Sequence, residues 1–162
     1  MYKKQSSPVY ICYMDASKAF DRVSHWILFK KLLCILPVIV IRFLVFWYSH
    51  QQFSVKWGGC LSSEFCVKNG VRQGGILSPV LFNIYMNDLS KNLNVLKMGC
   101  SVNGLNVNHL IYADDMVLLA PSPDALQGLI NECEMYANDN AIRFNPIKTV
   151  CMTVLPKWLK HL

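Results

Sequence analysis

The hydrophobic positions in the first third of the chain predict one strand followed by two helices. Residues 9–14 are β-branched and aromatic, which is the composition of a buried strand. Ser24 is a suitable N-cap for a helix that begins at His25 and whose apolar residues recur every three or four positions. Pro37 interrupts this helix, and a second apolar helix is expected to continue through Tyr48.

Turn signals then introduce a hairpin and a longer helix. A glycine pair separates the runs 52–57 and 64–68, which indicates a hairpin. Ser78 and the proline after it provide an N-cap and a proline at the first helical position. A helix with apolar residues at helical spacing is therefore expected from Ser78 through Leu89.

The last third predicts a tight hairpin, a helix and a final strand. Residues 109–120 form two short apolar runs that are separated only by Asp114 and Asp115. A connection of two residues predicts a hairpin with the acidic pair at its tip. Ser122 caps the next helix, and residues 150–154 have the pattern of a last strand.

This order of elements favours an α+β fold. It consists of a strand, helices, a hairpin, a helix and a strand, with a helical and looped insertion after the first strand. Around an antiparallel sheet, it matches the split β-α-β, ferredoxin-like plan. The sequence has no internal repeat, low-complexity tract or compositional break that would mark a linker. We therefore expect residues 1–162 to form a single domain.

Composition narrows the class of protein. The chain is 53% hydrophobic and 16% charged, whereas ordinary soluble domains have about 45–50% apolar and about 25% charged residues, so a disordered tail is excluded. Its most hydrophobic stretch, residues 32–48, contains Pro37 and Arg42. We predict that this stretch forms a buried helix pair rather than a membrane span. Residues 1–8 lack the apolar run of a signal peptide. We expect no secretion and no membrane partner.

The net charge indicates a class of binding partner, and the cysteine content indicates a cellular compartment. Sixteen Lys and Arg against ten Asp and Glu give a net charge of +6, which favours a polyanionic partner. The seven cysteines form an odd set without a C-x-x-C motif. An intracellular, reducing location, the cytoplasm or the nucleus, fits this set best.

Three aspartates lie where metal chemistry is expected. Asp15 follows the first strand, and Asp114 and Asp115 lie in the hairpin; with the two elements adjacent, Asp15 and Asp114 can face each other across two strands. Divalent cations prefer such oxygen ligands, and two ions about 3.5–4 Å apart stabilise both oxygens of a phosphoryl transfer. Alternation puts Tyr112 and Asp114 on one side, which favours Asp114 as the direct ligand and Asp115 as an accessory. An acidic pair is also a common turn sequence, so the pair by itself leaves both readings open.

Four short motifs occur in order along the chain. They are D-A-S-K-A-F-D-R-V from Asp15, G-V-R-Q-G-G-I-L-S-P-V-L-F-N-I-Y-M-N-D-L from Gly70, Y-A-D-D from Tyr112 and N-P-I-K-T from Asn145. Their order and spacing resemble the palm motifs of the reverse transcriptases of non-LTR, LINE-type retrotransposons. The resemblance extends from Val9 to Met152.

This resemblance implies an RNA-directed DNA polymerase with a palm fold. Such an enzyme adds deoxynucleoside triphosphates to the 3′-hydroxyl of a DNA primer on an RNA template, with two Mg²⁺ ions that Mn²⁺ can replace. By the resemblance, Asp15, Asp114 and Asp115 are the catalytic metal-binding carboxylates, and the backbone carbonyl of Ala16 joins the metal shell. Lys148 corresponds to a lysine that protonates or steadies the pyrophosphate leaving group, although the glycine usual upstream of it is replaced by Ala141-Ile142-Arg143.

The resemblance also implies residues that bind nucleotide and template. Phe20 matches an aromatic residue that excludes the 2′-hydroxyl of a ribonucleotide, while Gln73 and Gly74 would line the nucleotide pocket and the template strand. Arg72 would contact phosphate, and Tyr112 lies beside the catalytic acids. Without the motifs, Phe20 would be a core residue, the glycines a turn and Lys148 an exposed lysine.

The extent of the resemblance leaves alternative functions open. The motifs predict a truncated palm region, without the fingers, thumb and endonuclease that the longer polymerases carry, so the remaining modules of a longer product are expected partners. The chain is then a polymerase palm, a degenerate palm that binds nucleic acid through its basic surface, or a catalytically incompetent fragment. A fragment of the last kind would expose apolar surface and aggregate.

Overall fold

The computed structural model describes residues 7–156 and divides the chain into two compact units. The sheet unit comprises residues 1–19 and 86–162, and the insertion unit comprises residues 20–85. Both boundaries fall within helices, α1 (Ala19–Arg22) and α4 (Ser78–Leu96). Since a continuous helix crosses the second boundary, the sequence has no linker there.

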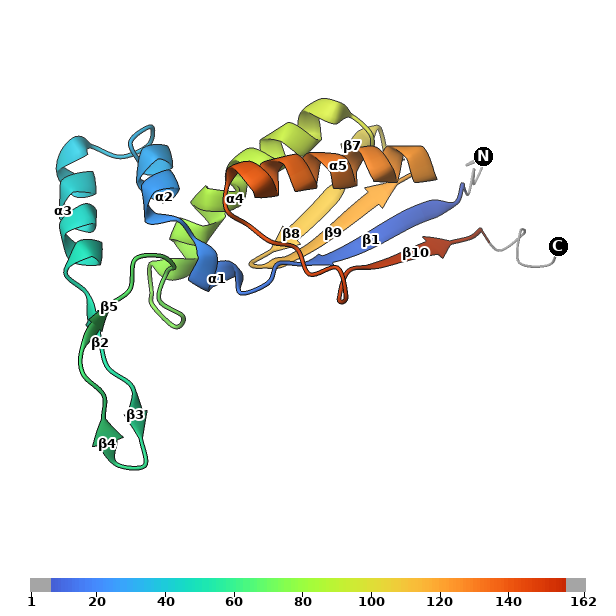
Figure 1. Cartoon of the computed structure of the whole chain (residues 1–162). Coiled ribbons are helices and arrows are strands. Elements are labelled where there is room, and N and C mark those ends of the chain that lie inside the picture. The colour runs from blue at the N-terminus through green and yellow to red at the C-terminus, as the bar shows by residue number, and fades with distance from the viewer. Residues whose placement is uncertain (1–6, 157–162) are drawn as a thin grey trace. The chain divides into compact units, whose positions relative to one another are not determined.

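The sheet unit contains a four-stranded antiparallel sheet with the order β10-β1-β9-β8. Its strands are β1 (Val9–Asp15), β8 (His109–Tyr112), β9 (Asp115–Ala120) and β10 (Val150–Val154). Helix α5 (Pro123–Asp139) and the second half of α4 lie on one face of the sheet (Figure 1). The predicted α+β, split β-α-β plan is confirmed: the first strand lies between the third and the fourth, and the second lies at the edge.

The core of the sheet unit lies between the sheet and these two helices. Strand alternation places Cys12 and Met14 of β1 on the buried face together with Met116 and Leu118 of β9. The helices contribute one apolar stripe each, Met86, Leu89 and Leu93 from α4 and Leu126, Leu129, Cys133, Tyr136 and Ala137 from α5. The residues that alternate with the buried ones form the opposite face of the sheet, which we call the open face.

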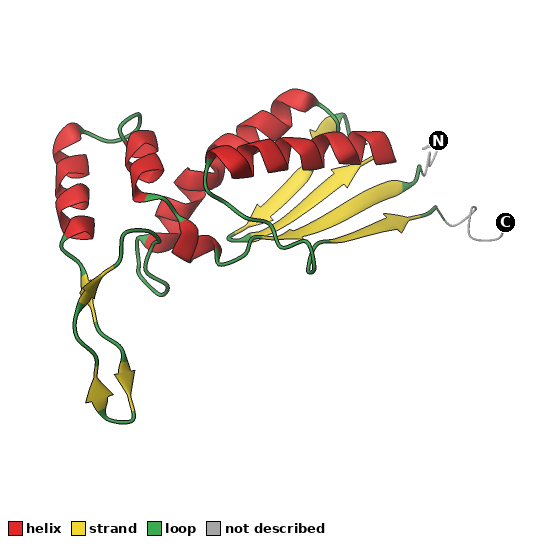
Figure 2. Ribbon diagram, in the orientation of Figure 1, coloured by secondary structure: helices red, strands yellow, loops and turns green. Residues whose placement is uncertain are grey.

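The insertion unit consists of short helices and a long two-part hairpin (Figure 2). Helices α2 (His25–Leu32) and α3 (Val38–Ser49) follow α1. The hairpin is built from two strand pairs, β2 (Gln52–Phe53) with β5 (Phe65–Cys66) and β3 (Lys56–Trp57) with β4 (Cys60–Leu61). The predicted break at Pro37, the hairpin around Gly58-Gly59 and the helix start at Ser78 are confirmed.

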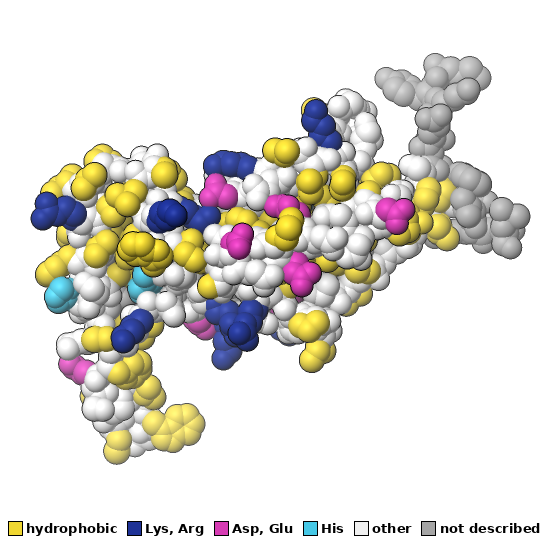
Figure 3. Space-filling view, turned by 45° about the horizontal axis from the view of Figure 1, so that its top comes forward, with side chains coloured by type: hydrophobic (Ala, Val, Ile, Leu, Met, Phe, Trp, Pro, Cys, Tyr) yellow, Lys and Arg dark blue, Asp and Glu magenta, His cyan; other side chains and the backbone are white. Residues whose placement is uncertain are grey.

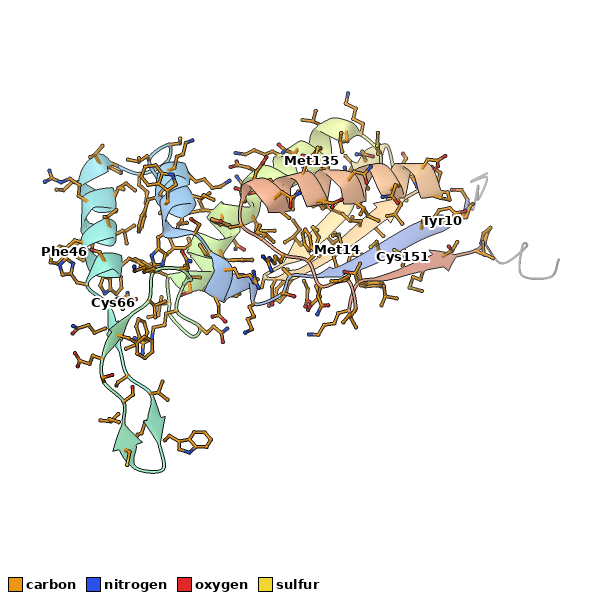
Figure 4. The ribbon with its side chains drawn as sticks, viewed as in Figure 1. Tyr10, Met14, Phe46, Cys66, Met135 and Cys151 are labelled. Atoms are coloured by element: carbon orange, nitrogen blue, oxygen red, sulfur yellow. The ribbon has the colours of Figure 1, made fainter. Side chains whose placement is uncertain are left out.

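The prediction that residues 32–48 form a buried helix pair is only half correct. Two helices are present, but α3 buries only the stripe of Ile41, Leu44 and Tyr48. Apolar side chains cover much of the visible surface of the insertion unit (Figure 3), and Phe46 projects from α3 with 62% of its surface exposed (Figure 4). A helix that is apolar all round but packs on one side leaves the rest of that surface uncovered. Within residues 7–156, none of the helices combines the length and apolar character needed to cross a membrane.

One hairpin was not predicted from the sequence. Strands β6 (Cys100–Val102) and β7 (Leu105–Val107) pair around Asn103-Gly104. Both turn residues have positive φ, +50° and +81°, as Asn-Gly turns between strands require. The Asn-Gly dipeptide was therefore an available signal.

All seven cysteines are free thiols in the structure.

Candidate active site

The hairpin that carries Y-A-D-D turns one residue earlier than predicted. Strand β8 ends at Tyr112, β9 begins at Asp115, and these two residues pair across the turn. The turn residues are thus Ala113 and Asp114, and placing both acids at the tip was wrong. Ala113 adopts a φ of +52°, a conformation that few residues other than glycine take. The buried positions of Met116 and Leu118 require this register, because they place Asp115 on the open face.

Asp15 faces Asp115 rather than Asp114. The last residue of β1 pairs directly with the first residue of β9, so both side chains lie on the open face. Directly opposite residues of an antiparallel pair have Cβ atoms about 4.5–5.5 Å apart. Asp114 follows in the turn and is exposed. The three aspartates therefore lie within one end of the sheet, at the junction of β1 with the hairpin.

Lys148 lies beside Asp15. Its Nζ atom is 3.6 Å from Asp15 Oδ2, with 67% and 32% of the two side chains exposed. The preceding loop is held by Asn145, whose side-chain oxygen accepts from the Ile147 N–H and whose carbonyl accepts from the backbone and hydroxyl of Thr149. The first and fourth motifs, far apart in the sequence, thus meet at one carboxylate.

Backbone hydrogen bonds join the same two motifs. Ser17 N donates to Arg143 O, and Asn145 N donates to Asp15 O. Both N···O distances are 2.8 Å, and the two bonds lie on either side of a β-bridge between Ala16 and Phe144. The Ala16 carbonyl takes no part in these two bonds. In the part of the chain that the structure describes, no three His, Cys, Asp or Glu side chains gather closely enough to hold one metal ion, so the side chains alone do not form a complete coordination shell.

The position before the fourth motif, where the usual glycine is absent, has the backbone conformation that favours glycine. Helix α5 ends in a Schellman motif: Ile142 N donates to Ala137 O, and Ala141 has a φ of +54°. The substitution changes the residue at this turn but keeps the turn itself, and the chain still leads to Lys148.

In the insertion unit, the first and second motifs pack against each other. The Gly70 N–H donates to the Val23 carbonyl at 2.7 Å. The Val71 N–H donates to the Phe20 carbonyl at 2.8 Å. Gly70 has a φ of +92°, and a Cβ there would lie 2.9 Å from the Asp21 carbonyl oxygen, so only glycine fits this approach. The Phe20 ring stacks on Phe82 with centroids 4.7 Å apart.

The predicted nucleotide-binding residues form an exposed turn before α4. Gln73 Nε2 lies 3.4 Å from Asp21 Oδ1, and the Arg72 carbonyl accepts from Gly75 N and Ser78 Oγ. Gly74 has a φ of +77°. Arg72, Gln73 and Gly74 line one cavity, together with aromatic and amide side chains of residues 47–53 that sequence reasoning missed. The adjacent aromatic residues Trp47 and Tyr48 were the available signal in the sequence.

A second missed feature is a hydrogen-bonded histidine behind the hairpin. His109, the first residue of β8, bonds through Nδ1 to Asn108 Oδ1 and through Nε2 to Ser90 Oγ of α4, both at 2.7 Å. Because the Asn108 oxygen only accepts, Nδ1 donates and Nε2 accepts from the hydroxyl. Asn108 Nδ2 donates to Leu93 O, and burial lowers the pKa of His109. This network connects α4 to the strand that leads to Y-A-D-D.

Comparison with known proteins identifies the family. The chain matches the family described as reverse transcriptase (RNA-dependent DNA polymerase) over residues 1–160. The chain belongs to the reverse transcriptase family. It is 33% identical over 146 residues to the Pol polyprotein of the type-2 retrotransposable element R2DM of Drosophila melanogaster, covering 90% of this chain and 14% of that protein. It is 32% identical over 135 residues to the RNA-directed DNA polymerase from mobile element jockey of Drosophila funebris, covering 78% of this chain and 14% of the relative.

Solved structures show the same fold. Apo telomerase from Candida tropicalis, truncated from its C-terminal domain, matches 94% of this chain and 32% of its own length with a TM-score of 0.73 and 19% identity. Telomerase from the same organism in complex with a fragment of telomeric RNA matches with a TM-score of 0.71 and 18% identity, covering 93% of this chain and 27% of that one. This member of the reverse transcriptase family spans about a seventh of the length of the retrotransposon proteins that it matches.

Proposed function

We propose that this chain is the catalytic palm of an RNA-directed DNA polymerase from a non-LTR retrotransposon. The observation that carries the proposal is the pairing of Asp15 with Asp115 on the open face, with Asp114 in the adjoining turn and Lys148 3.6 Å from Asp15. Two strand ends, one turn and one loop contribute these groups. The relatives that this chain matches are named as RNA-directed DNA polymerases or Pol polyproteins.

The donor set fits two Mg²⁺ ions, which Mn²⁺ can replace. Magnesium is typically held by only one or two carboxylates, with water and substrate phosphates completing its shell, and this matches an end of the sheet where the carboxylates are few and solvent-accessible. Asp15, Asp114 and Asp115 would hold the ions, and the Ala16 carbonyl would add a neutral ligand. Bound there, such ions would supply Lewis-acid activation of the primer hydroxyl and charge stabilisation at the transferring phosphoryl group.

The residues of the chain then position the reacting groups. The primer 3′-hydroxyl loses its proton to water, its oxygen forms a bond to the α-phosphorus of a deoxynucleoside triphosphate, and the bond from that phosphorus to pyrophosphate breaks. Lys148 supplies a proton or a positive charge to the departing pyrophosphate, for which its ammonium group, close to Asp15, is suited. Since alignment of reactants accounts for about 7–11 kcal/mol of such barriers, the fixed loop around Asn145 supports this role.

The exposed turn and the first motif would recognise the nucleotide and the template. Gly74 allows the backbone to approach a substrate, Gln73 offers an amide to a base, and Arg72 pairs with phosphate. The Phe20 ring, held by its stacking on Phe82, would exclude a 2′-hydroxyl. Tyr112, which is 86% exposed beside Asp115, would contact the primer or template.

The proposed partners are an RNA template, a DNA primer and deoxynucleoside triphosphates, together with the remaining modules of a longer polymerase. The proposed location is the cytoplasm or the nucleus, where the seven free thiols stay reduced.

Primer extension on an RNA template tests the proposal. The wild-type chain should incorporate labelled deoxynucleotides in Mg²⁺, and Asp114→Asn and Asp15→Asn should lower the rate by about 100-fold or more, because a metal-bound carboxylate contributes several kcal/mol to catalysis. Asp139→Asn, at the exposed end of α5, is the matched control and should retain activity. Absence of extension by the wild-type chain at any enzyme concentration would refute autonomous catalysis.

A further inference from the structure

Two cysteines from distant parts of the sequence face each other in the sheet unit. Cys12 of β1 pairs directly with Cys151 of β10, so both side chains lie on the same face of the sheet. Among the strand pairs that the structure describes within residues 7–156, no other cysteine lies directly opposite a second one. Neither residue belongs to any of the four sequence motifs.

The two thiols interact with each other. Burial raises the pKa of the Cys12 thiol to about 12, and a hydrogen bond and charge repulsion with Cys151 add to this increase. A disulfide spans Cα atoms that are about 4.4–6.8 Å apart, and directly opposite residues of an antiparallel pair have Cα atoms about 4.5 or about 5.5 Å apart. The register of β1 and β10 therefore places the two cysteines at a separation that a disulfide can bridge.

Cys12 and Cys151 differ in their exposure to solvent. Cys12 is fully buried, because α5 packs on β1 and β9. Strand β10 is an edge strand whose five residues are all exposed, and Cys151 lies on this strand (Figure 4). A small oxidant can therefore contact the Cys151 thiol, whereas the Cys12 thiol is accessible to Cys151 and not to the oxidant.

A third thiol, Cys133 of α5, is a further neighbour of Cys12. Burial, and to a smaller extent the charge of Cys12, raise the pKa of Cys133 to about 12. Cys133 is fully buried, so it cannot be the first thiol to meet an oxidant. Oxidation of this group of thiols therefore begins at Cys151, and the sulfur directly opposite it belongs to Cys12.

We propose that Cys12 and Cys151 form a redox pair, in which a small-molecule disulfide such as glutathione disulfide oxidises Cys151 and Cys12 then closes a cross-strand disulfide. Exposed disulfides are easily reduced again, and disulfides of reducing compartments are usually transient and redox-sensing. This pair is independent of the polymerase function proposed above, because its chemistry needs neither metal nor nucleic acid.

The reaction consists of two thiol–disulfide exchanges. The Cys151 thiol loses its proton to water, and its sulfur attacks the small disulfide, whose S–S bond breaks and releases one thiolate. The Cys12 thiol then loses its proton to water, its sulfur attacks Cys151 Sγ in the mixed disulfide, and the second small-molecule thiolate leaves. The two protein thiols are oxidised, and the small disulfide is reduced to two thiolates, which take up the released protons.

The disulfide would fix an edge strand that has one neighbour in the sheet. β10 pairs only with β1 in the described sheet, and it follows the loop that brings Lys148 to Asp15. The bond closes a loop that contains most of the chain, which restricts the unfolded state. Oxidation should therefore raise Tm by about 4–16 °C and slow the hydrogen exchange of the β10 amides.

Oxidation with glutathione disulfide at pH 7.5, followed by alkylation, digestion and mass spectrometry, tests the proposal. The main disulfide of the wild-type chain should join Cys12 to Cys151. Cys12→Ala should stop at the mixed disulfide on Cys151, and Cys151→Ser should leave Cys12 reduced. Cys34→Ser removes an exposed cysteine of the insertion unit and is the matched control, which should form the disulfide as the wild type does.

Each further measurement supports or overturns the proposal. A main disulfide between Cys12 and Cys133, a mixed disulfide at Cys151 that persists in the wild-type chain, or no oxidation of either residue would overturn it. The selectivity for Cys12 and Cys151 should disappear in urea, where the register of β1 and β10 is lost, and dithiothreitol should return Tm to that of the reduced chain. Cys151→Ser changes only an exposed edge residue, so it keeps the test decisive where Cys12→Ala fails to fold.

Discussion

At the scale of single residues, two alanines in the sheet unit occupy backbone conformations that glycine usually takes. Ala113 in Y-A-D-D and Ala141 before the fourth motif have φ values of +52° and +54°. A left-handed conformation costs a residue with a Cβ about 1–2 kcal/mol. Ala113 adjoins the aspartates that we propose to be catalytic, and backbone strain is often found at functional sites. Ala141 lies at a helix end, where the strain serves no reaction.

Replacing Ala141 by glycine should stabilise the protein. We expect Ala141→Gly to raise the free energy of unfolding by about 0.5–1 kcal/mol, because the strain is relieved and only part of the gain is offset by the greater flexibility of the unfolded chain. The measurement is urea denaturation followed by circular dichroism. Ala125→Gly, within α5, should lower the free energy by about 0.5–1 kcal/mol. A similar loss in both variants would show that Ala141 is not strained.

At the scale of elements, the hairpin that carries the acids depends on a helix behind it. Helix α4 contacts the start of β8 through the Ser90, His109 and Asn108 hydrogen bonds. With a neutral imidazole, Nδ1 donates to Asn108 and Nε2 accepts from the Ser90 hydroxyl. Protonation of His109 would place a positive charge in a half-buried site, where desolvation disfavours it.

This network predicts a stability that falls with acidification. Burial lowers the pKa of His109 below its ordinary value of about 6.5, so below that pH the unfolded chain binds a proton that the folded chain does not. The free energy of unfolding should therefore decrease as pH falls from about 7.5 through 6.5 towards the lowered pKa. Urea denaturation at pH 7.5 and 5.5 measures the decrease.

His109→Gln should make this decrease smaller, since the substituted residue does not titrate. His50→Gln, at the exposed end of α3, is the control and should keep the wild-type decrease. Identical pH dependence in His109→Gln and the wild type would exclude His109 as the titrating group.

At the scale of the whole molecule, the two units differ in charge and in how well they bury their apolar residues. The sheet unit has a closed core between its sheet and two helices, whereas α3 and the hairpin of the insertion unit expose Val38, Ile39, Phe43, Phe46 and Trp57. Most of the net positive charge lies in the insertion unit. The insertion unit therefore combines exposed apolar side chains with most of the net positive charge.

The rates of cysteine alkylation should differ between the buried thiols of the sheet unit and the exposed thiols of the insertion unit. In the sheet unit, Cys12 and Cys133 are fully buried, and burial is the main cause that raises the pKa of each thiol to about 12. In the insertion unit, Cys60 and Cys66 are exposed. With iodoacetamide at pH 7.5, Cys12 and Cys133 should react at least about 100-fold more slowly than Cys60, since only thiolates react.

Mass spectrometry of the digested protein assigns each rate, and a sample in urea should lose the difference. Equal rates at Cys12 and Cys60 in buffer would contradict the packing of α5 on β1.

The sequence by itself determined the elements and the family. Alternation in residues 9–14, the Ser-Pro pairs that start α4 and α5, and the glycine pair in the long hairpin each have a local physical cause, so they could be predicted without the fold. The four motifs identified the polymerase family because they preserve order as well as residue type. The Asn-Gly turn of β6 and β7 is also local and could have been predicted.

Only the tertiary structure decided which of these residues meet. The pairing of Asp15 with Asp115, instead of Asp114, follows from strand register, which the burial of Met116 and Leu118 fixes. The contact of Lys148 with Asp15, the stacking of Phe20 on Phe82 and the cavity beside Trp47 join segments distant in sequence. Local periodicity carries no information about such contacts, because they depend on how separate elements pack.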